Sequence, residues 1–516
     1  MNPALRNAAL LAALAFIGFW IGSWQLPLFD LDEGAFSQAT LEMLDSGNYL
    51  TTTLDGEPRY DKPMLSYWLQ GLAVTALGPH EFAFRLPSML AASLWMLMLF
   101  GFVRARSQNQ GAAWLAAAAL ALSPMPSIIG HAATADAILD LLLTAALLDI
   151  YRHFESGRRA PVLRAYLWMG LGVLTKGPVA IAIPLLVSLL YALWDGRWRQ
   201  WLGGVFEWRG WLILLAVVLP WGVMCWQSDG GEFIRHFLFD HNLGRYQNTL
   251  QGHGGKPYYY LIALPVIVWP FVALLPGALK QGLFGGALER FCIVWFATVF
   301  VLFSFSGTQL PHYLLYGATP LFVLFGLNAH RLPARGWLLA PGWILLALFV
   351  ALPWILPMIE TPPKRAWEAG VIAEAIAAFG PGYHVLSIAA LAIAILALRL
   401  RPLAGLLTTA AMCTLTLWLA VGPVLAAAQQ EPTRQAALRA RALGLPAVRY
   451  ATYLPTFSVY RGAPTPGRLP QPGELAFVRA DKLAQMQSLL GDAPLREEYR
   501  KGGVVLVHRL PPADAP

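Results

Sequence analysis

Residues 165–194 read AYLWMGLGVLTKGPVAIAIPLLVSLLYALW, an apolar block that only Thr175-Lys176-Gly177-Pro178 interrupts. The block is too long for one membrane span of roughly 17–25 residues and short for two. Glycine favours left-handed turns and proline ends helices, so Gly177-Pro178 predicts a turn between two short helices. The block therefore predicts a membrane protein that crosses the bilayer several times.

The composition of the whole chain supports this interpretation. Of its 516 residues, 57% are hydrophobic and only 13% are charged, whereas soluble domains are roughly 25% charged. This balance excludes a typical soluble enzyme, a disordered chain and an ordinary nucleic-acid binder. The three cysteines lie far apart in apolar runs, which argues against a zinc site and a disulfide scaffold.

Runs of apolar residues predict a mostly α-helical fold with about thirteen transmembrane helices. We expect them near residues 8–28, 84–103, 112–130, 135–151, 165–175, 177–194, 210–227, 258–279, 291–305, 311–329, 337–356, 383–398 and 403–427. Residues 64–78 are apolar but shorter, and they predict an interfacial helix rather than a span.

The orientation of the spans follows from the arginines and lysines in the short loops. These residues recur at every second connection, together with Arg6 near the N-terminus. Because basic loops stay in the cytoplasm, we expect a cytoplasmic N-terminus. The opposite side would hold residues 29–83, 228–257, 357–382 and the tail from 428. The net charge of +8 is thus a topology signal.

The end of the chain differs from the rest, which divides the molecule into two parts. Residues 1–428 would form the transmembrane domain, with the first outer loop and its interfacial helices at 29–83. Residues 429–516 would form a small soluble α/β domain on the outer side. There we expect a helix over Thr433–Leu443 and strands over Ala447–Tyr453, Glu474–Val478 and Gly503–His508.

The first outer loop carries three carboxylates at the exit of a membrane helix: Asp30, Asp32 and Glu33. One interpretation is structural, with Asp32 capping a helix from Glu33 to Ser46 that stops at Gly47 and lies on the membrane surface. A cap needs only one carboxylate, so the spacing also fits a functional site.

Further polar residues fall on the same predicted side. Asp136 and Asp140 share one face of the fourth span, where ionisable groups are costly and usually functional. Lys176 lies in the outer turn between the two short spans, and Ser304–Tyr316 (SFSGTQLPHYLLY) is unusually polar. The outer loop 228–257 is rich in Arg and His, which a solvated loop would also explain. Nucleotide-binding and zinc-protease motifs are absent from the sequence, which argues against cytoplasmic nucleotide-driven chemistry.

An ordered series of motifs resembles a known family. It comprises Asp32-Glu33, Glu42–Tyr49 (EMLDSGNY), Asp55-Gly56, Tyr60-Asp61-Lys62-Pro63, Glu81–Pro87 (EFAFRLP), Thr175–Pro178 (TKGP), His241-Asn242 with Arg245-Tyr246, and Ser306–Tyr313 (SGTQLPHY). The series resembles the ArnT-like, protein-mannosyltransferase-type glycosyltransferases (family 39) of the GT-C fold. The resemblance covers roughly residues 27–330.

The resemblance implies an inverting sugar transfer from a polyprenyl-monophosphate donor, with lipid A-like aminoarabinose transfer among the options. Asp32 would be the catalytic base, assisted by Glu33 and Asp136. The expected substrate-binding residues are Lys62, Tyr60, Arg245, Tyr246, Lys176, His312 and Tyr313. Two features depart from the aminoarabinose enzymes: Ala35-Phe36 replaces an Arg-Tyr pair, and Gln309 replaces a lysine.

The expected partners are the lipid-linked sugar donor, membrane lipids and an envelope acceptor, with no nucleic acid. A monophosphate donor needs no cofactor, although a divalent metal stays an open alternative, with Glu33, His253 and His312 as candidate ligands. The resemblance places the enzyme in the bacterial inner membrane. A secondary transporter or lipid flippase is the main competing hypothesis, and a non-catalytic scaffold is another; polar groups gathered at one interface favour the transferase.

Overall fold

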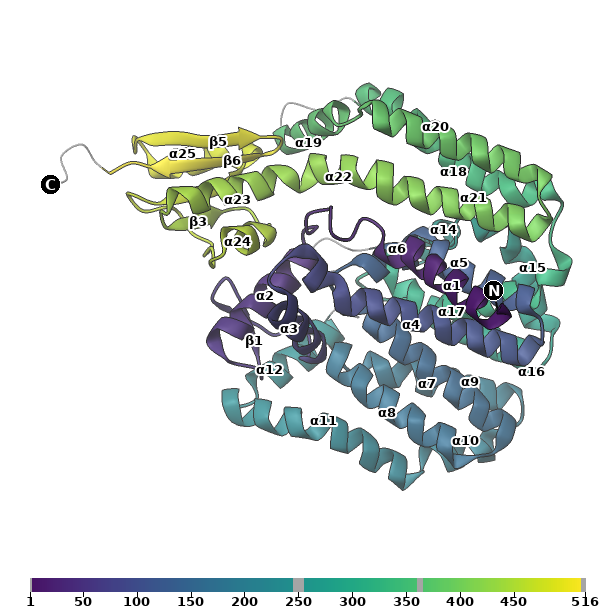
Figure 1. Ribbon diagram of the computed structural model, residues 1–516. Coiled ribbons are helices and arrows are strands. Elements are labelled where there is room, and N and C mark those ends of the chain that lie inside the picture. The colour runs from purple at the N-terminus through teal and green to yellow at the C-terminus, as the bar shows by residue number, and fades with distance from the viewer. Residues whose placement is uncertain (1, 245–254, 360–364, 512–516) are drawn as a thin grey trace.

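The computed structural model describes residues 2–244, 255–359 and 365–511, and Figure 1 shows its arrangement. Helices form most of the molecule, and a small sheet lies at the C-terminal end. The mostly α-helical fold class with a small C-terminal α/β unit is therefore confirmed.

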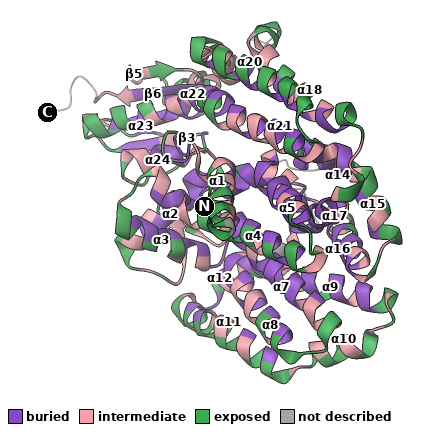
Figure 2. Cartoon of the chain, turned by 45° about the vertical axis from the view of Figure 1, so that its right-hand side comes forward, coloured by how far each residue is buried: buried purple, intermediate pink, exposed green. Residues whose placement is uncertain are grey.

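Six helices in the described residues are long and apolar enough to cross a membrane. Three of them are α4 (Glu81–Ser107), α11 (Trp208–Asp229) and α16 (Ala287–Ser304). The fourth spans Arg335–Met358 and contains α18 (Arg335–Ile355), and the fifth spans Pro381–Arg399 and contains α20 (Pro381–Leu396). The sixth spans Pro402–Gln429 and contains α21 (Pro402–Thr416) and α22 (Gly422–Gln429). Figure 2 shows exposed residues along the outer helices such as α11. Among these are Leu212, Leu219 and Trp226, apolar side chains that suit contact with lipid.

Several predicted spans are bent or short. The segment 112–130 is α5 (Gln110–Leu122) and α6 (Pro124–His131), which meet at 63°, and α14 (Tyr259–Ile267) meets the helical segment Phe271–Phe284, which contains α15 (Leu275–Phe284), at 110°. Counting each bent pair as one span gives up to eight spans in the part of the chain described. The expected count of about thirteen is not confirmed.

Residues 311–329 do not form the expected span. The chain makes a 3₁₀ turn over Pro311–Gly317 and then the nine-residue helix α17 (Thr319–Leu327). At 1.5 Å per residue, such a helix covers only about half of a bilayer's hydrocarbon thickness. The 3₁₀ turn brings His312 and Tyr313 to the wall of a cavity.

The hairpin predicted from the apolar block is present. Helix α8 (Arg159–Lys176) ends at Gly177, whose φ is +86°, and α9 (Val179–Trp194) starts after Pro178. Before it, α7 (Asp136–Ser156) packs along α8. Lys176 thus lies at the end of one helix, beside the start of another.

The first loop folds into α2 (Asp32–Ser46), a hairpin of β1 (Thr52–Leu54) and β2 (Glu57–Arg59), and α3 (Leu65–Leu77). Gly47 ends α2 in the left-handed conformation, as predicted. Phe36, Ala39 and Met43 are buried against α3 and its neighbours, so the apolar stripe of α2 packs against protein.

The last part of the chain packs against that loop. Its sheet has the order β3-β4-β6-β5, with β3 (Ala447–Tyr450) parallel to β4 (Leu475–Arg479), and β6 (Val504–Arg509) antiparallel to β4 and β5 (Leu495–Lys501). Its helices are α23 (Glu431–Leu443), α24 (Thr456–Arg461) and α25 (Leu483–Leu490). Helix α24 contacts both α2 and α23, which places the sheet beside the first loop in Figure 1.

Candidate active site

A cavity of about 630 Å³ opens where the first loop, the starts and ends of membrane helices and the C-terminal sheet meet. Acidic, basic and aromatic side chains line it together. The lining includes Asp30, Asp32, Phe36, Arg59, Tyr60, Asp61, Lys62, Asp136, Lys176, His312, Tyr313, Arg449 and Tyr453. Most of the predicted site residues that the structure describes therefore share one cavity.

Asp32 is the first residue of α2 and reaches this cavity. The N-cap of α2 is Leu31, and no side chain caps the helix, so the capping interpretation of Asp32 is wrong. Asp32 is exposed, and within the described residues no hydrogen bond or ion pair engages its carboxylate. This leaves a carboxylate in the cavity that is free to contact a substrate and to act as a base.

Asp136 begins α7 and anchors a second group of side chains. Its Oδ1 accepts hydrogen bonds from Nζ of Lys176 and from the Tyr316 hydroxyl at 3.1 Å, and Nε2 of His312 lies 3.6 Å away. Nζ of Lys176 also donates to the Tyr316 hydroxyl at 2.8 Å. The Asp136 carboxylate therefore connects α7, α8 and the 3₁₀ turn Pro311–Gly317, and it holds Lys176 at the cavity wall.

Lys62 forms the other basic part of the inner wall. Its Nζ donates to Oδ1 of Asp61 at 2.6 Å, and Asp61 accepts from Arg59 as well, at 3.1 Å. Tyr60 stacks on His236 with ring centroids 5.1 Å apart, and its hydroxyl donates to Glu232 at 3.2 Å. Because Lys62 and Lys176 both line this cavity, two ammonium groups face the same space.

Asp30 joins the first loop to helix α24. Its carboxylate accepts from the backbone N–H of Thr456 at 3.0 Å and from the Thr456 hydroxyl. Burial raises the pKa of Asp30 to about 7, more than the two hydrogen bonds lower it. Asp30 is thus partly protonated near neutral pH, and its two contacts with Thr456 suit a structural role.

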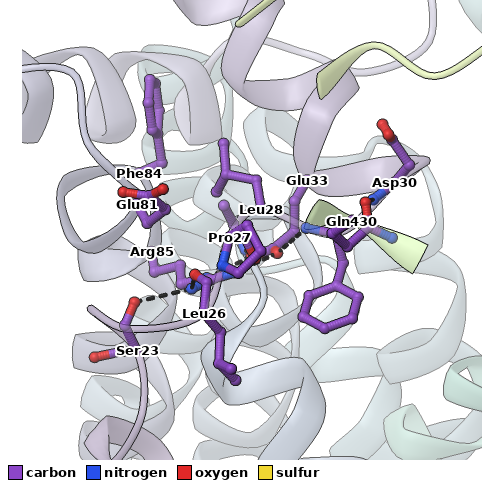
Figure 3. A network of polar contacts seen from close by, with 12 residues as sticks. Ser23, Leu26, Pro27, Leu28, Asp30, Glu33, Glu81, Phe84, Arg85 and Gln430 are labelled. Carbon is purple, nitrogen blue, oxygen red and sulfur yellow. Dashed lines mark hydrogen bonds and ion pairs between the residues drawn. The ribbon is translucent and has the colours of Figure 1, made fainter. Parts of the chain in front are cut away.

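Glu33 does not join the residues around Asp32. Figure 3 shows it in a buried network with Arg85. Its Oε1 accepts from Nε of Arg85 and the N–H of Ala133, both at 2.8 Å, and its Oε2 accepts from Nη2 of Arg85 and the N–H of Phe29, both at 2.7 Å. With four donors on its oxygens, Glu33 holds the loop in place and is not placed to take a proton from a substrate.

Some predictions fall outside the described residues: Arg245, Tyr246 and the metal candidate His253. The other two metal candidates are apart, since Glu33 faces a separate cavity with Arg85 and His131, whereas His312 faces the one with Asp32. Across the described residues, no group of three or more His, Cys, Asp or Glu side chains could hold a metal ion.

Sequence reasoning missed Tyr316, Arg449 and Tyr453. Tyr316 lies three residues after Tyr313, and this spacing could have placed both on one face of the short helix. Arg449 and Tyr453 belong to the C-terminal part, and nothing in their local sequence distinguishes them from other residues of a soluble sheet.

Comparisons with known proteins agree with this architecture. A family model described as dolichyl-phosphate-mannose-protein mannosyltransferase matches residues 61–225. The crystal structure of ArnT from Cupriavidus metallidurans bound to undecaprenyl phosphate superposes with a TM-score of 0.83, at 21% identity over 98% of both chains. The chain has the fold of the ArnT-like glycosyltransferases. The resemblance expected from its motifs is confirmed.

Three relatives of this ArnT-like chain are described as undecaprenyl phosphate-alpha-4-amino-4-deoxy-L-arabinose arabinosyl transferases. Those of Shewanella sediminis and Edwardsiella ictaluri are 26% and 27% identical, over 63% and 68% of this chain. That of Pseudomonas paraeruginosa is 29% identical over 61% of this chain. The similar region spans 60%, 66% and 60% of these relatives' lengths, respectively.

The buried pair in this ArnT-like fold predicts a large loss of stability in Arg85→Ala. The change leaves the Glu33 carboxylate buried without its cation, which typically costs about 3–5 kcal/mol. Thermal unfolding of the purified protein in detergent should show a clearly lower midpoint. Arg106→Ala, on the same helix, removes a more exposed pair with Glu155 and should shift the midpoint little. Equal midpoints for the two variants would contradict the importance of the buried pair.

Proposed function

We propose that this protein is an inverting glycosyltransferase that uses a sugar linked to a polyprenyl monophosphate. The acceptor is a hydroxyl or phosphate of an envelope molecule, and lipid A-like aminoarabinose transfer is the first candidate. One observation carries the proposal: in the part of the chain that the structure describes, no hydrogen bond or ion pair engages the Asp32 carboxylate, and two lysines line the same cavity. The names of the relatives and the bound ligand of the similar structure support the donor class.

The arrangement fits a single displacement at the anomeric carbon. The acceptor oxygen forms the new bond while Asp32 takes its proton, and the bond between the anomeric carbon and the phosphate oxygen breaks. The leaving polyprenyl phosphate gains negative charge, which Lys62 and Lys176 stabilise. Attack from the face opposite the leaving group inverts the anomeric centre.

The remaining residues would position these groups. Asp136 and Tyr316 fix the ammonium of Lys176, while His312 and Tyr313 line the phosphate side of the cavity. The leaving group is a single phosphate, so there is no diphosphate for a metal ion to bridge. The two lysines supply the positive charge that stabilises it. We therefore propose that no cofactor is needed and that a divalent metal is not required.

Asp32→Asn tests the proposed base directly. The amide keeps the size of the side chain but cannot take a proton, so the transfer rate should fall about 10²–10⁴-fold. Turnover of a purified lipid-linked sugar donor, followed by mass spectrometry of the product, measures the rate. Binding of polyprenyl phosphate should persist, because removing a negative charge cannot weaken attraction to an anion.

Asp30→Asn is the matched control for Asp32→Asn. Asparagine resembles the protonated form of Asp30, which burial already favours near neutral pH, so activity should change far less. A folded Asp32→Asn enzyme with near wild-type turnover would refute the base assignment.

Lys62→Ala should weaken binding of polyprenyl phosphate, the leaving group of the proposed reaction. A charge-assisted hydrogen bond contributes about 1.5–3 kcal/mol, so the affinity for polyprenyl phosphate should fall roughly tenfold to hundredfold. Titration of the purified protein in detergent measures this, with Lys280→Ala as control because Lys280 is exposed and outside the cavity. Unchanged affinity in Lys62→Ala would place the phosphate elsewhere.

We also propose that the protein lies in the bacterial inner membrane with a cytoplasmic N-terminus and a periplasmic C-terminal sheet. Cysteine labelling in intact cells tests this, since Cys225, Cys292 and Cys413 are buried and give little background. An impermeant maleimide should label Asp492→Cys but not Arg158→Cys, both at exposed positions. The reverse pattern would invert the topology.

A further inference from the structure

The C-terminal sheet contributes part of the wall of the cavity that contains Asp32. Arg449, in β3, and Tyr453, just beyond that strand, line the cavity with the first loop. The proposed transfer assigns neither residue a role.

Two carboxylates of the first loop anchor the segment that carries these residues. Asp30 accepts from Thr456, as described above, and Asp55 accepts from the Ser458 hydroxyl at 2.6 Å and the N–H of Thr465 at 3.0 Å. Gly34 allows this approach, because a Cβ there would lie 2.6 Å from the backbone nitrogen of Thr456. The sheet is therefore a fixed wall of the cavity.

Arg449 is held from one side and leaves donor capacity on the other. Its Nε donates to Asp55 at 3.3 Å, and its Nη1 donates to the carbonyl of Thr452 at 3.2 Å. Throughout the described parts of the chain, its Nη2 has no hydrogen-bond acceptor. The guanidinium carbon lies 5.4 Å from the ring centroid of Tyr453, whose side chain is 42% exposed.

Among the described residues, four lysine and arginine side chains line the cavity, and one of them, Arg59, is bonded to Asp61 between the lysines and Tyr453. Lys62 and Lys176 belong to the group around Asp136 and His312, whereas Arg449 lies beside Tyr453 and electrostatically close to Asp55. The proposed function assigns the lysines to the donor phosphate. Arg449 is a fixed cation whose Nη2 has no acceptor among the described residues, and it lies beside the partly exposed ring of Tyr453, so it is available to the other substrate.

We propose that Arg449 and Tyr453 form the acceptor subsite and select acceptors with an anionic oxygen beside a sugar ring. Nη2 of Arg449 binds the phosphate or carboxylate oxygen, because guanidinium geometry suits both anions. The ring of Tyr453 packs against the sugar face, which its rigid, amphipathic side chain suits. This inference rests on the proposed glycosyl transfer.

Steady-state kinetics of the full-length protein in detergent test the proposal. The donor is a polyprenyl-phosphate-linked aminoarabinose, and the acceptor is lipid A with its phosphates or after enzymatic dephosphorylation. Arg449→Gln should raise KM for the phosphorylated acceptor roughly tenfold to hundredfold, with kcat and donor affinity nearly unchanged. It should have little effect on KM for the dephosphorylated acceptor, and Arg449→Lys should recover part of the discrimination.

Further variants separate recognition from a structural role. Asp55→Asn weakens the anchor but keeps the Arg449 charge, so it should lower the unfolding midpoint without removing the preference for phosphate. Arg439→Gln, an arginine paired with Glu498 in the same C-terminal part, should change neither. If Arg449→Gln does not fold, Tyr453→Leu serves as the test variant. It should raise the KM for the acceptor and leave kcat and donor affinity nearly unchanged.

The outcomes distinguish the inference from the function on which it rests. Wild-type protein that transfers no sugar from the lipid-linked donor would refute the proposed function. Wild-type transfer with unchanged acceptor KM in both Arg449→Gln and Tyr453→Leu would overturn the subsite alone. A loss of phosphate preference in Asp55→Asn equal to that in Arg449→Gln would show that the arginine only anchors the wall.

Discussion

The arrangement of the cavity depends on one buried ion pair, between Glu33 and Arg85. The arginine uses all five of its N–H donors, two on Glu33 and three on the carbonyls of Ser23, Leu26 and Pro27 at 2.7–2.8 Å (Figure 3). A buried charge is costly unless its partners are complete, so this set of contacts holds the chain between the first helix and α2 in one shape. Glu33 also accepts from the N–H of Ala133, just before α7. The same carboxylate therefore fixes the starts of the two helices that carry Asp32 and Asp136.

Adjacent carboxylates have different roles here because of helix geometry. Successive residues of an α-helix point about 100° apart, so when Glu33 points into the protein toward Arg85, Asp32 points toward the cavity. The sequence predicted that the Asp-Glu pair matters, but spacing alone could not show which residue faces the substrate. Burial decides this, and burial depends on where α4 places Arg85.

Local signals predicted local structure well. Gly47 ends α2, Gly177-Pro178 separates α8 from α9, and the helix expected over Thr433–Leu443 is α23. Uniformly apolar segments were harder, because periodicity cannot reveal the 63° bend between α5 and α6 or the short α17. The sequence predicted those site residues that belong to motifs of the first loop and of the membrane helices. Arg449 and Tyr453 were missed, because their place depends on the packing of the sheet against that loop.

The pairing of Lys176 with Asp136 matters for the proposed reaction. An unpaired ammonium would have several rotamers to lose on binding an anion, whereas Asp136 and Tyr316 already hold this one at the cavity wall. The neighbouring carboxylate also weakens attraction to a singly charged phosphodiester in the ground state. As the bond to the anomeric carbon breaks, the phosphate gains negative charge, so its attraction to Lys62 and Lys176 grows. Interactions that strengthen only toward the transition state raise the rate of the chemical step rather than the affinity for the donor. A lysine that is fixed in place and partly neutralised is therefore better suited to catalysis than a free one.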